Sequence, residues 1–188
     1  MGEYKTRALT KEQYKEIIKT IREGFLSTRP NKQVATCLVL EANLGMRIGD
    51  ILNLTLNSIV RDGDGYRLDI VEQKTQKQRD FTVPNEIYNY IKQYCVDEEI
   101  KSNERIFYIT TRQVQRILKR AVEFLGYTNI STHSFRKFYA TQIYINSNYN
   151  IKLVQELLQH ASILTTQKYV ILRDKELEDA IKNNVNLL

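Results

Sequence analysis

Apolar residues recur at helical spacing over most of this chain, and one short stretch near the middle breaks that period. Within residues 59–83, Tyr66, Leu68 and Ile70 alternate with polar residues, and residues 62–65 read Asp-Gly-Asp-Gly. Alternation with a period of two around Asp-Gly turns is typical of antiparallel hairpins. The sequence therefore predicts an α+β fold that is mainly α-helical and has a small three-stranded antiparallel sheet.

Helical segments are expected on both sides of this sheet. Thr10 and Gln13 have the spacing of a capping box, and Thr110 with Gln113 repeats it, while Gly45 suits the end of a helix. The first expected helix follows Thr10, the second ends at Gly45, and a short third carries Ile48 to Leu54. A fourth follows Pro84 and Asn85, and a fifth runs from Thr110 to Gly126. Further helices are expected at 135–145, 151–158 and 174–184. The expected strands are 59–61, 66–73 and 79–83, with a further brief strand at 107–109.

The composition limits the class of protein. A chain of 188 residues and 22.1 kDa suits one domain with a full core. No apolar run approaches the roughly 18 residues of a membrane span, the charged N-terminus is not followed by an apolar segment, and two cysteines are too few for a disulfide scaffold. We therefore expect a soluble, cytoplasmic protein without a membrane partner. The net charge of +6 permits a polyanionic partner but does not establish one.

Both histidines of the chain fall in residues 132–169. His133 precedes Arg136 by three positions, so the two side chains share one face if a helix begins here and can reach one small anion. His160 precedes Tyr169 by nine positions. A DNA phosphate is the anion that this pattern suggests, and Tyr169 is the candidate group to attack it.

Cleavage of a phosphodiester by a tyrosine requires helpers, because the phenol has an ordinary pKa near 10 and is almost wholly protonated at neutral pH. Two guanidinium groups can hold nonbridging oxygens and neutralise charge in the transition state. A histidine can take the tyrosine proton or brace the phosphate, and a lysine can protonate the departing 5′ oxygen. The candidates for these roles are Arg47 and Arg136, His133 and His160, and Lys74.

Each of these residues taken alone has a simpler explanation. A histidine three residues before an arginine often caps a helix or lies at the surface, and most of the twelve tyrosines should belong to the core. Arg47 beside Gly45 could be a charge at a helix C-terminus. The ordered combination is what favours a catalytic reading.

That combination resembles the tyrosine recombinase (phage integrase) family over nearly the whole chain, as the catalytic domain of that family. The motifs that carry the resemblance are Leu44 to Leu54, Lys74-Thr75, His133-Ser134-Phe135-Arg136, Leu158-Gln159-His160 and Thr165 to Tyr169. The resemblance implies paired catalytic arginines at 47 and 136, a hairpin lysine at 74, histidine positions at 133 and 160, the nucleophile Tyr169, and Asp50 as the acidic residue that supports the site.

One position departs from that family pattern, and at another the assignment has two candidates. Gln159 stands where the family commonly has glycine, so the backbone is expected to differ there. Lys77 is a rival to Lys74 as the hairpin lysine. Further DNA contacts are expected from Lys77 and Arg79 at the hairpin, and from a basic stripe on the helix after Thr110. A helix face that is only solvated would explain the same stripe equally well. The stripe consists of Arg112, Arg116, Lys119 and Arg120.

The function expected from the resemblance is site-specific recombination through a 3′-phosphotyrosyl intermediate, in integration or excision of a mobile element. Exchange of one phosphoester for another needs no cofactor, and the sequence has neither a nucleotide-binding phosphate loop nor a cluster of metal ligands. The alternatives are DNA relaxation of the type IB topoisomerase kind, and a DNA-binding module without catalysis.

The resemblance also gives expectations for domains and partners. Residues 1–188 are expected to form a single catalytic domain, without the core-binding and arm-binding domains that precede it in the family. Residues 171–188 are expected to form a tail helix that packs on a neighbouring protomer or on its own domain. The expected partners are double-stranded DNA and a DNA-bending accessory protein. The chain is expected to be a monomer in solution and to assemble with further copies of itself into a tetramer on DNA.

Overall fold

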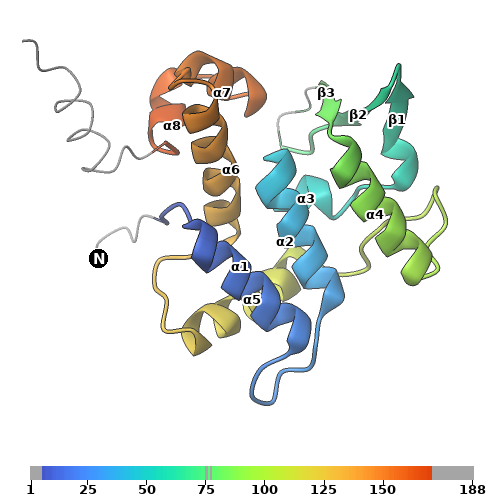
Figure 1. Ribbon diagram of the computed structural model, residues 1–188, viewed down its shortest axis with the longest axis vertical. Helices are drawn as coiled ribbons and strands as arrows, with labels where there is room; N and C mark the ends of the chain where they lie inside the picture. The colour runs from blue at the N-terminus through green and yellow to red at the C-terminus, as the bar shows by residue number, and fades with distance from the viewer. Residues whose placement is uncertain (1–5, 75, 77, 171–188) are drawn as a thin grey trace, which may run out of the picture. The chain divides into compact units, whose positions relative to one another are not determined.

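The structure is a computed structural model, and it describes residues 6–74, 76 and 78–170. Two compact units follow one another along the chain, one up to Tyr139 and the other from Ala140 onward, so that the boundary falls inside helix α6 (Thr132–Asn146) (Figure 1). Each unit is described by itself.

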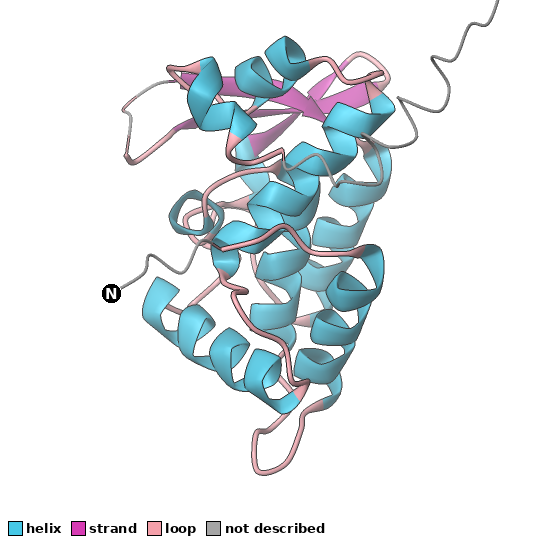
Figure 2. Cartoon of the chain, turned by 90° about the vertical axis from the view of Figure 1, so that its left-hand side faces the viewer, coloured by secondary structure: helices cyan, strands magenta, loops and turns pink. Residues whose placement is uncertain are grey.

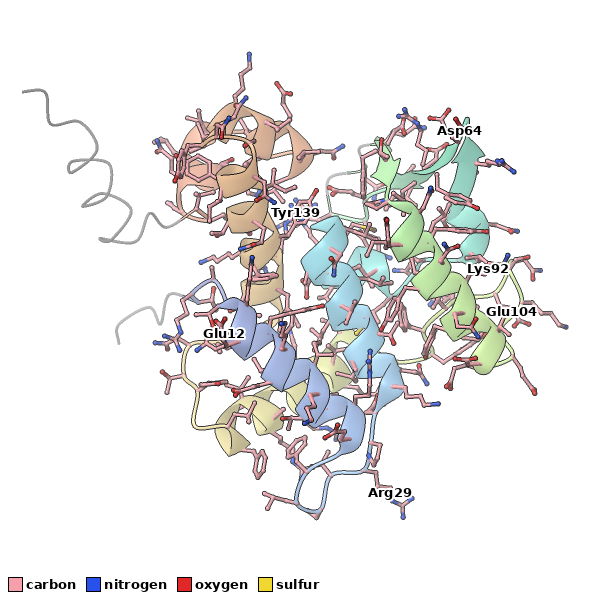
Figure 3. All side chains as sticks on the ribbon, in the orientation of Figure 1. Glu12, Arg29, Asp64, Lys92, Glu104 and Tyr139 are labelled. Carbon is pink, nitrogen blue, oxygen red and sulfur yellow. The ribbon has the colours of Figure 1, made fainter. Side chains whose placement is uncertain are left out.

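The first unit begins with two helices whose ends follow local rules. Helix α1 (Lys11–Glu23) starts at the predicted capping box, in which Thr10 and Gln13 bond reciprocally. Helix α2 (Lys32–Leu44) ends at Gly45, which has a left-handed φ of 58°. A Cβ atom at Gly45 would also lie 2.2 Å from the ring of Tyr139, a residue labelled in Figure 3. Glycine is therefore required here both by backbone conformation and by space.

The core of this unit lies among α1, α2 and α5 (Thr111–Phe124). Ile17, Leu38 and Leu118 are almost completely buried within it. Each apolar side chain buried in this way contributes roughly 1.5–3 kcal/mol relative to an exposed one. The strands gather at the opposite end of the unit from α1 and α5 (Figures 1 and 2).

The predicted three-stranded antiparallel sheet is confirmed. Strands β1 (Ile59–Asp62), β2 (Gly65–Val71) and β3 (Gln78–Val83) lie in the order β1-β2-β3, with Leu68 opposite both Ile59 and Phe81. The expectation that the second strand continues to Gln73 was wrong. The ladder ends at Val71 because the next residue, Glu72, turns its buried side chain toward Arg47 instead.

The remaining elements of the first unit are α3 (Ile48–Ile51), the 3-10 helix η1 (Leu56–Ser58) and α4 (Asn85–Asp97). The strand expected at 107–109 does not form. Only an isolated bridge between Thr55 and Arg105 precedes it, and the Ile106 amide donates to the Leu54 carbonyl at 2.9 Å. A single bridge does not continue into a ladder, so residues 107–109 form no strand and lead directly to Thr110, the N-cap of α5.

The second unit contains the end of α6, then α7 (Ile151–Leu157) and the short α8 (Ile163–Gln167), which pack together. Asn150 caps α7 and Ser162 caps α8 through their side chains. Helix α8 was not predicted, because five residues are too few for a helical period to be visible. The helix expected at 174–184, like the whole predicted tail, lies outside the described residues. No helix among those described is long and apolar enough to cross a membrane.

Candidate active site

Arg47 lies at the junction between α2 and α3. It occupies the N-cap position of α3 with an extended backbone, φ −73° and ψ 146°, so the helix begins only at the next residue, Ile48. Its Nη1 donates to Oε2 of Glu72, and the Glu72 side chain is 0% exposed while that of Arg47 is 26% exposed. The guanidinium is therefore anchored on a buried carboxylate and still reaches the surface.

Asp50 lies one turn further on in α3 and is buried. Its Oδ1 accepts a hydrogen bond of 2.9 Å from the amide of Gln73, just beyond the end of β2. Asp50 thus joins the segment that carries Arg47 to the hairpin that carries Lys74.

Lys74 lies in the turn that follows β2 and is exposed. Its rival Lys77 lies outside the described residues. The backbone of Arg79 lies opposite Ile70 in the ladder between β2 and β3. The choice of Lys74 as the hairpin lysine and the DNA contacts expected from Lys77 and Arg79 remain predictions.

His133 lies in the first turn of α6 and is exposed, whereas Arg136 is 1% exposed. The pKa of His133 is lowered from its ordinary value of 6.5, first by loss of solvation and then by the positive charges of Arg136, Lys137, Lys74 and Arg47. Three predicted site cations therefore lie within electrostatic reach of one imidazole. The lowered pKa favours the uncharged imidazole, which is the form that can accept a proton.

A buried acid on α2 lies within electrostatic reach of Arg136. Glu41 is 2% exposed, and burial raises the pKa of its carboxyl well above the ordinary value while the charge of Arg136 opposes that rise. Sequence reasoning did not single out Glu41. A signal existed, because Glu41 lies on a helix whose neighbouring residues Leu38, Leu40 and Leu44 are apolar and buried.

His160 and Tyr169 lie together in the second unit. Tyr169 follows α8 in a turn and is half-buried, and its amide donates to the carbonyl of Thr166 at 2.8 Å. Its ring meets the His160 ring edge to face, with centroids 4.7 Å apart and planes at 63°. His160 Nδ1 lies 3.0 Å from the hydroxyl of the fully buried Thr166, which fixes the direction of the imidazole.

The turn before His160 has an unusual backbone. Gln159 has a φ of 51°, in the left-handed region that glycine enters without strain. Two hydrogen bonds between Gln155 and the backbone of His160 hold the turn. The His160 amide donates to the Gln155 carbonyl at 3.0 Å, and Gln155 Nε2 donates to the His160 carbonyl at 3.0 Å. Gln159 therefore adopts a conformation that suits glycine.

The basic stripe of α5 is exposed along its whole length. Three of its four members line a hollow of about 580 Å³ at the start of the helix, whereas Arg120 does not line it. The hollow is lined by Thr110, Arg112, Gln113, Gln115, Arg116 and Lys119. Lys119 lies 3.8 Å from Glu123, an exposed i,i+4 pair of little energetic weight. The DNA contacts expected from this stripe remain a prediction.

The predicted site residues thus fall into two groups. The first unit contains Arg47, Asp50, Lys74, His133 and Arg136, and the second contains His160 and Tyr169. Two acids that sequence reasoning missed, Glu41 and Glu72, are buried within the first group. No group of side chains with metal-ligand character occurs among the described residues.

Solved structures with the same fold include two of particular interest. The XerH site-specific recombinase in its post-cleavage complex with a palindromic difH substrate superimposes with a TM-score of 0.72 at 21% identity, over 93% of this chain and 52% of that one. The catalytic domain of bacteriophage HP1 integrase gives a TM-score of 0.66 at 19% identity, over 96% of each chain. The fold is therefore that of tyrosine recombinase catalytic domains.

Sequence comparison agrees. Residues 7–176 match the family described as the phage integrase family, and the chain belongs to that family. It is 28% identical to the tyrosine recombinase XerA of Pyrococcus furiosus over 193 aligned positions, which cover 97% of this chain and 63% of that protein. It is 30% identical to the probable integrase/recombinase YoeC of Bacillus subtilis over 162 positions, which cover 82% and 85% of the two chains. The chain spans 63% and 50% of the lengths of the XerA protein and of the XerC protein of Caldanaerobacter subterraneus.

Proposed function

We propose that this chain acts as the catalytic domain of a site-specific DNA recombinase that cleaves and rejoins strands through a phosphotyrosine bond. The observation that carries the proposal is that the predicted cations Arg47, Lys74 and Arg136 all lie within electrostatic reach of His133. Membership of the phage integrase family supports the same chemistry.

The arginines bind the scissile phosphate. A phosphodiester has one negative charge in the ground state and gains charge as the nucleophile approaches, so fixed guanidinium donors stabilise the transition state more than the ground state. Arg47 enters this arrangement already oriented by Glu72. Arg136 is held in the interior, where its charge is screened less by water.

Tyr169 attacks the phosphorus atom. A bond forms between the phenolic oxygen and phosphorus, and the bond between phosphorus and the 5′ oxygen breaks. The phenolic proton passes to the neutral imidazole of His133, and Lys74 gives a proton to the departing 5′ oxygen. His160 braces the tyrosine ring edge to face. Attack by a different 5′ hydroxyl reverses these steps and completes strand exchange without nucleotide hydrolysis.

The proposed substrate is double-stranded DNA. The net charge of +6 and the exposed basic stripe of α5 support binding to a phosphate backbone. Solved relatives include the XerH recombinase bound to its difH substrate and the Tn1549 transposon integrase in complex with a circular intermediate DNA. Integration or excision of a mobile element, assembly of four protomers on DNA and help from a DNA-bending protein belong to the same proposal.

Covalent trapping tests the proposal. Nicked suicide duplexes, drawn from a randomised pool and from the ends of the element that encodes the protein, lose a short strand after cleavage and trap the adduct. We expect a denaturation-resistant adduct with the wild-type protein and none with Tyr169→Phe. Tyr149→Phe, at an exposed tyrosine of the same unit, is the matched control and should behave as wild type. An adduct that survives in Tyr169→Phe would contradict the assignment of the nucleophile.

A further inference from the structure

Glu72 is a fully buried acid at the point where the hairpin leaves the sheet. It follows the last residue of β2, its side chain is 0% exposed, and it lies two positions before Lys74. Its carboxylate accepts a hydrogen bond from Arg47. A buried carboxylate is unfavourable unless it is paired, so its presence requires a compensating partner or a function.

A second set of bonds joins the same two segments. The Gln73 amide donates to Asp50 Oδ1 at 2.9 Å, and Asp50 lies in the short helix that Arg47 caps. The hairpin tip is also closed on itself, since the Gln76 amide donates to the Glu72 carbonyl at 2.9 Å and Gln76 Nε2 donates to the Gln73 carbonyl at 2.8 Å. The turn that carries Lys74 is therefore tied to the Arg47 segment at two adjacent residues.

The geometry of the ion pair leaves Arg47 able to bind a ligand. A guanidinium has five N–H donors in a rigid plane, and Glu72 engages the Nη1 end. The Arg47 side chain remains 26% exposed, so part of it is accessible to a ligand at the surface. A carboxylate behind an arginine fixes the rotamer of that arginine before any phosphate arrives, and this reduces the ordering needed at the moment of reaction.

We propose that Glu72 is a positioning residue that holds the guanidinium of Arg47 and the Lys74 hairpin in a fixed mutual geometry. The inference rests on the proposed function, in which Arg47 binds the scissile phosphate and Lys74 protonates the leaving oxygen. Glu72 touches neither the phosphate nor the leaving group. It acts by holding Arg47, which binds the phosphate, rigidly in place relative to Lys74, which donates the proton.

This role differs from that of a residue that only stabilises the fold. Glu72→Gln removes a negative charge from behind the phosphate site, which favours binding of a polyanion, and at the same time frees the Arg47 rotamer and loosens the hairpin. DNA affinity should therefore stay equal or increase while cleavage becomes slower. A smaller fraction of folded protein would lower both quantities together.

The test compares four proteins on one nicked suicide duplex that the wild type cleaves: the wild type, Glu72→Gln, Glu72→Asp, and the control Glu23→Gln at an exposed position at the end of α1. Circular dichroism checks folding, a filter or anisotropy titration gives the DNA Kd, and single-turnover cleavage at saturating DNA gives the rate constant. We expect Glu72→Gln to cleave about tenfold or more slowly with a Kd no weaker than that of the wild type. Glu72→Asp keeps the charge on a shorter side chain and should fall between the two, and Glu23→Gln should match the wild type.

The outcomes separate this inference from the proposed function. A cleavage rate for Glu72→Gln within twofold of wild type, or a defect confined to Kd, would overturn the positioning role while leaving Tyr169 chemistry in place. A wild-type protein that forms no adduct on any duplex would contradict the proposed function itself. If Glu72→Gln does not fold, Glu72→Asp decides: a slower rate at unchanged Kd supports the role, and a wild-type rate overturns it.

Discussion

At the scale of single residues, the proposed reaction depends on the charge state of His133. Loss of solvation, and then the positive charges of four nearby cations, lower the pKa of the imidazole. A neutral ring can accept the phenolic proton of Tyr169, whereas a charged one cannot. In the proposed complex, the negative charge of a bound phosphate near the ring raises the His133 pKa again, so the ring becomes a better base when the substrate is present.

The protonation of His133 can be measured directly, because the chain has two histidines and NMR titration will give two sets of imidazole resonances, assigned with His133→Gln. We expect a His133 pKa below 6.5 that rises in Lys137→Gln, which removes one of the cations that lower it. Since the folded pKa lies below the unfolded one, this residue contributes stability above the unfolded pKa, and the contribution is lost as pH falls through the folded pKa.

Lys152→Gln is the control for that titration. It removes the charge of an exposed lysine on α7 that is not among the groups that lower the His133 pKa, so that pKa should stay unchanged. A His133 pKa at or above 6.5, or one that does not respond to Lys137→Gln, would contradict the electrostatic description of the site.

Glu41 gives a second pH-dependent prediction. Burial raises its folded pKa well above the ordinary 4.5, so its contribution to stability is present below the unfolded pKa and is lost as pH rises through the folded pKa. Urea unfolding between pH 5 and 8 should show the wild type losing stability relative to Glu41→Gln, by at most about 1.4 kcal/mol per pH unit. Glu23→Gln should follow the wild type. A constant difference between wild type and Glu41→Gln across this range would mean that Glu41 does not titrate there.

At the scale of elements, local signals were read correctly and distant ones were not. The capping boxes at Thr10 and Thr110 and the glycine at 45 act within one turn of the chain, so sequence alone predicts where α1 and α5 begin and where α2 ends. Glu72 follows the end of the β2 ladder and pairs with Arg47, 25 residues earlier in the chain. No local sequence pattern predicts a bond between residues so far apart. The proposed site residues were predicted from ordered family motifs, whereas Glu41 and Glu72, the buried acids near the two arginines, belong to no such motif.

The basic stripe of α5 provides a prediction for one element. Arg112, Arg116 and Lys119 line a common hollow, and their combined change to glutamine should weaken DNA binding. The slope of log Kd against log salt should fall by about 0.9 for each phosphate that the variant no longer neutralises. Lys11, Lys15 and Lys19 on α1 are exposed and offer a control that removes the same charge. Equal weakening in the two triple variants would show that net charge alone drives binding and that α5 is merely a solvated face.

At the scale of the whole molecule, the proposed reaction needs both units. The first contributes the arginines, the lysine and His133, and the second contributes Tyr169 and its brace His160. Helix α6 belongs to both, because it begins with His133 and Arg136 in its first turns and continues past Tyr139. The proposed activity therefore depends on one helix that carries phosphate-binding residues at its start and leads into the unit of the nucleophile at its end.

The most direct test of the proposed chemistry identifies the residue that becomes bonded to DNA. Digestion of the trapped adduct with trypsin, which cuts after Lys168 and Arg173, releases residues 169–173 with Tyr169 as the only tyrosine. Mass spectrometry should find a nucleotide attached through its 3′ phosphate to this peptide. A nucleotide on any other peptide, or no adduct from duplexes that the protein binds, would contradict the claim that Tyr169 is the nucleophile.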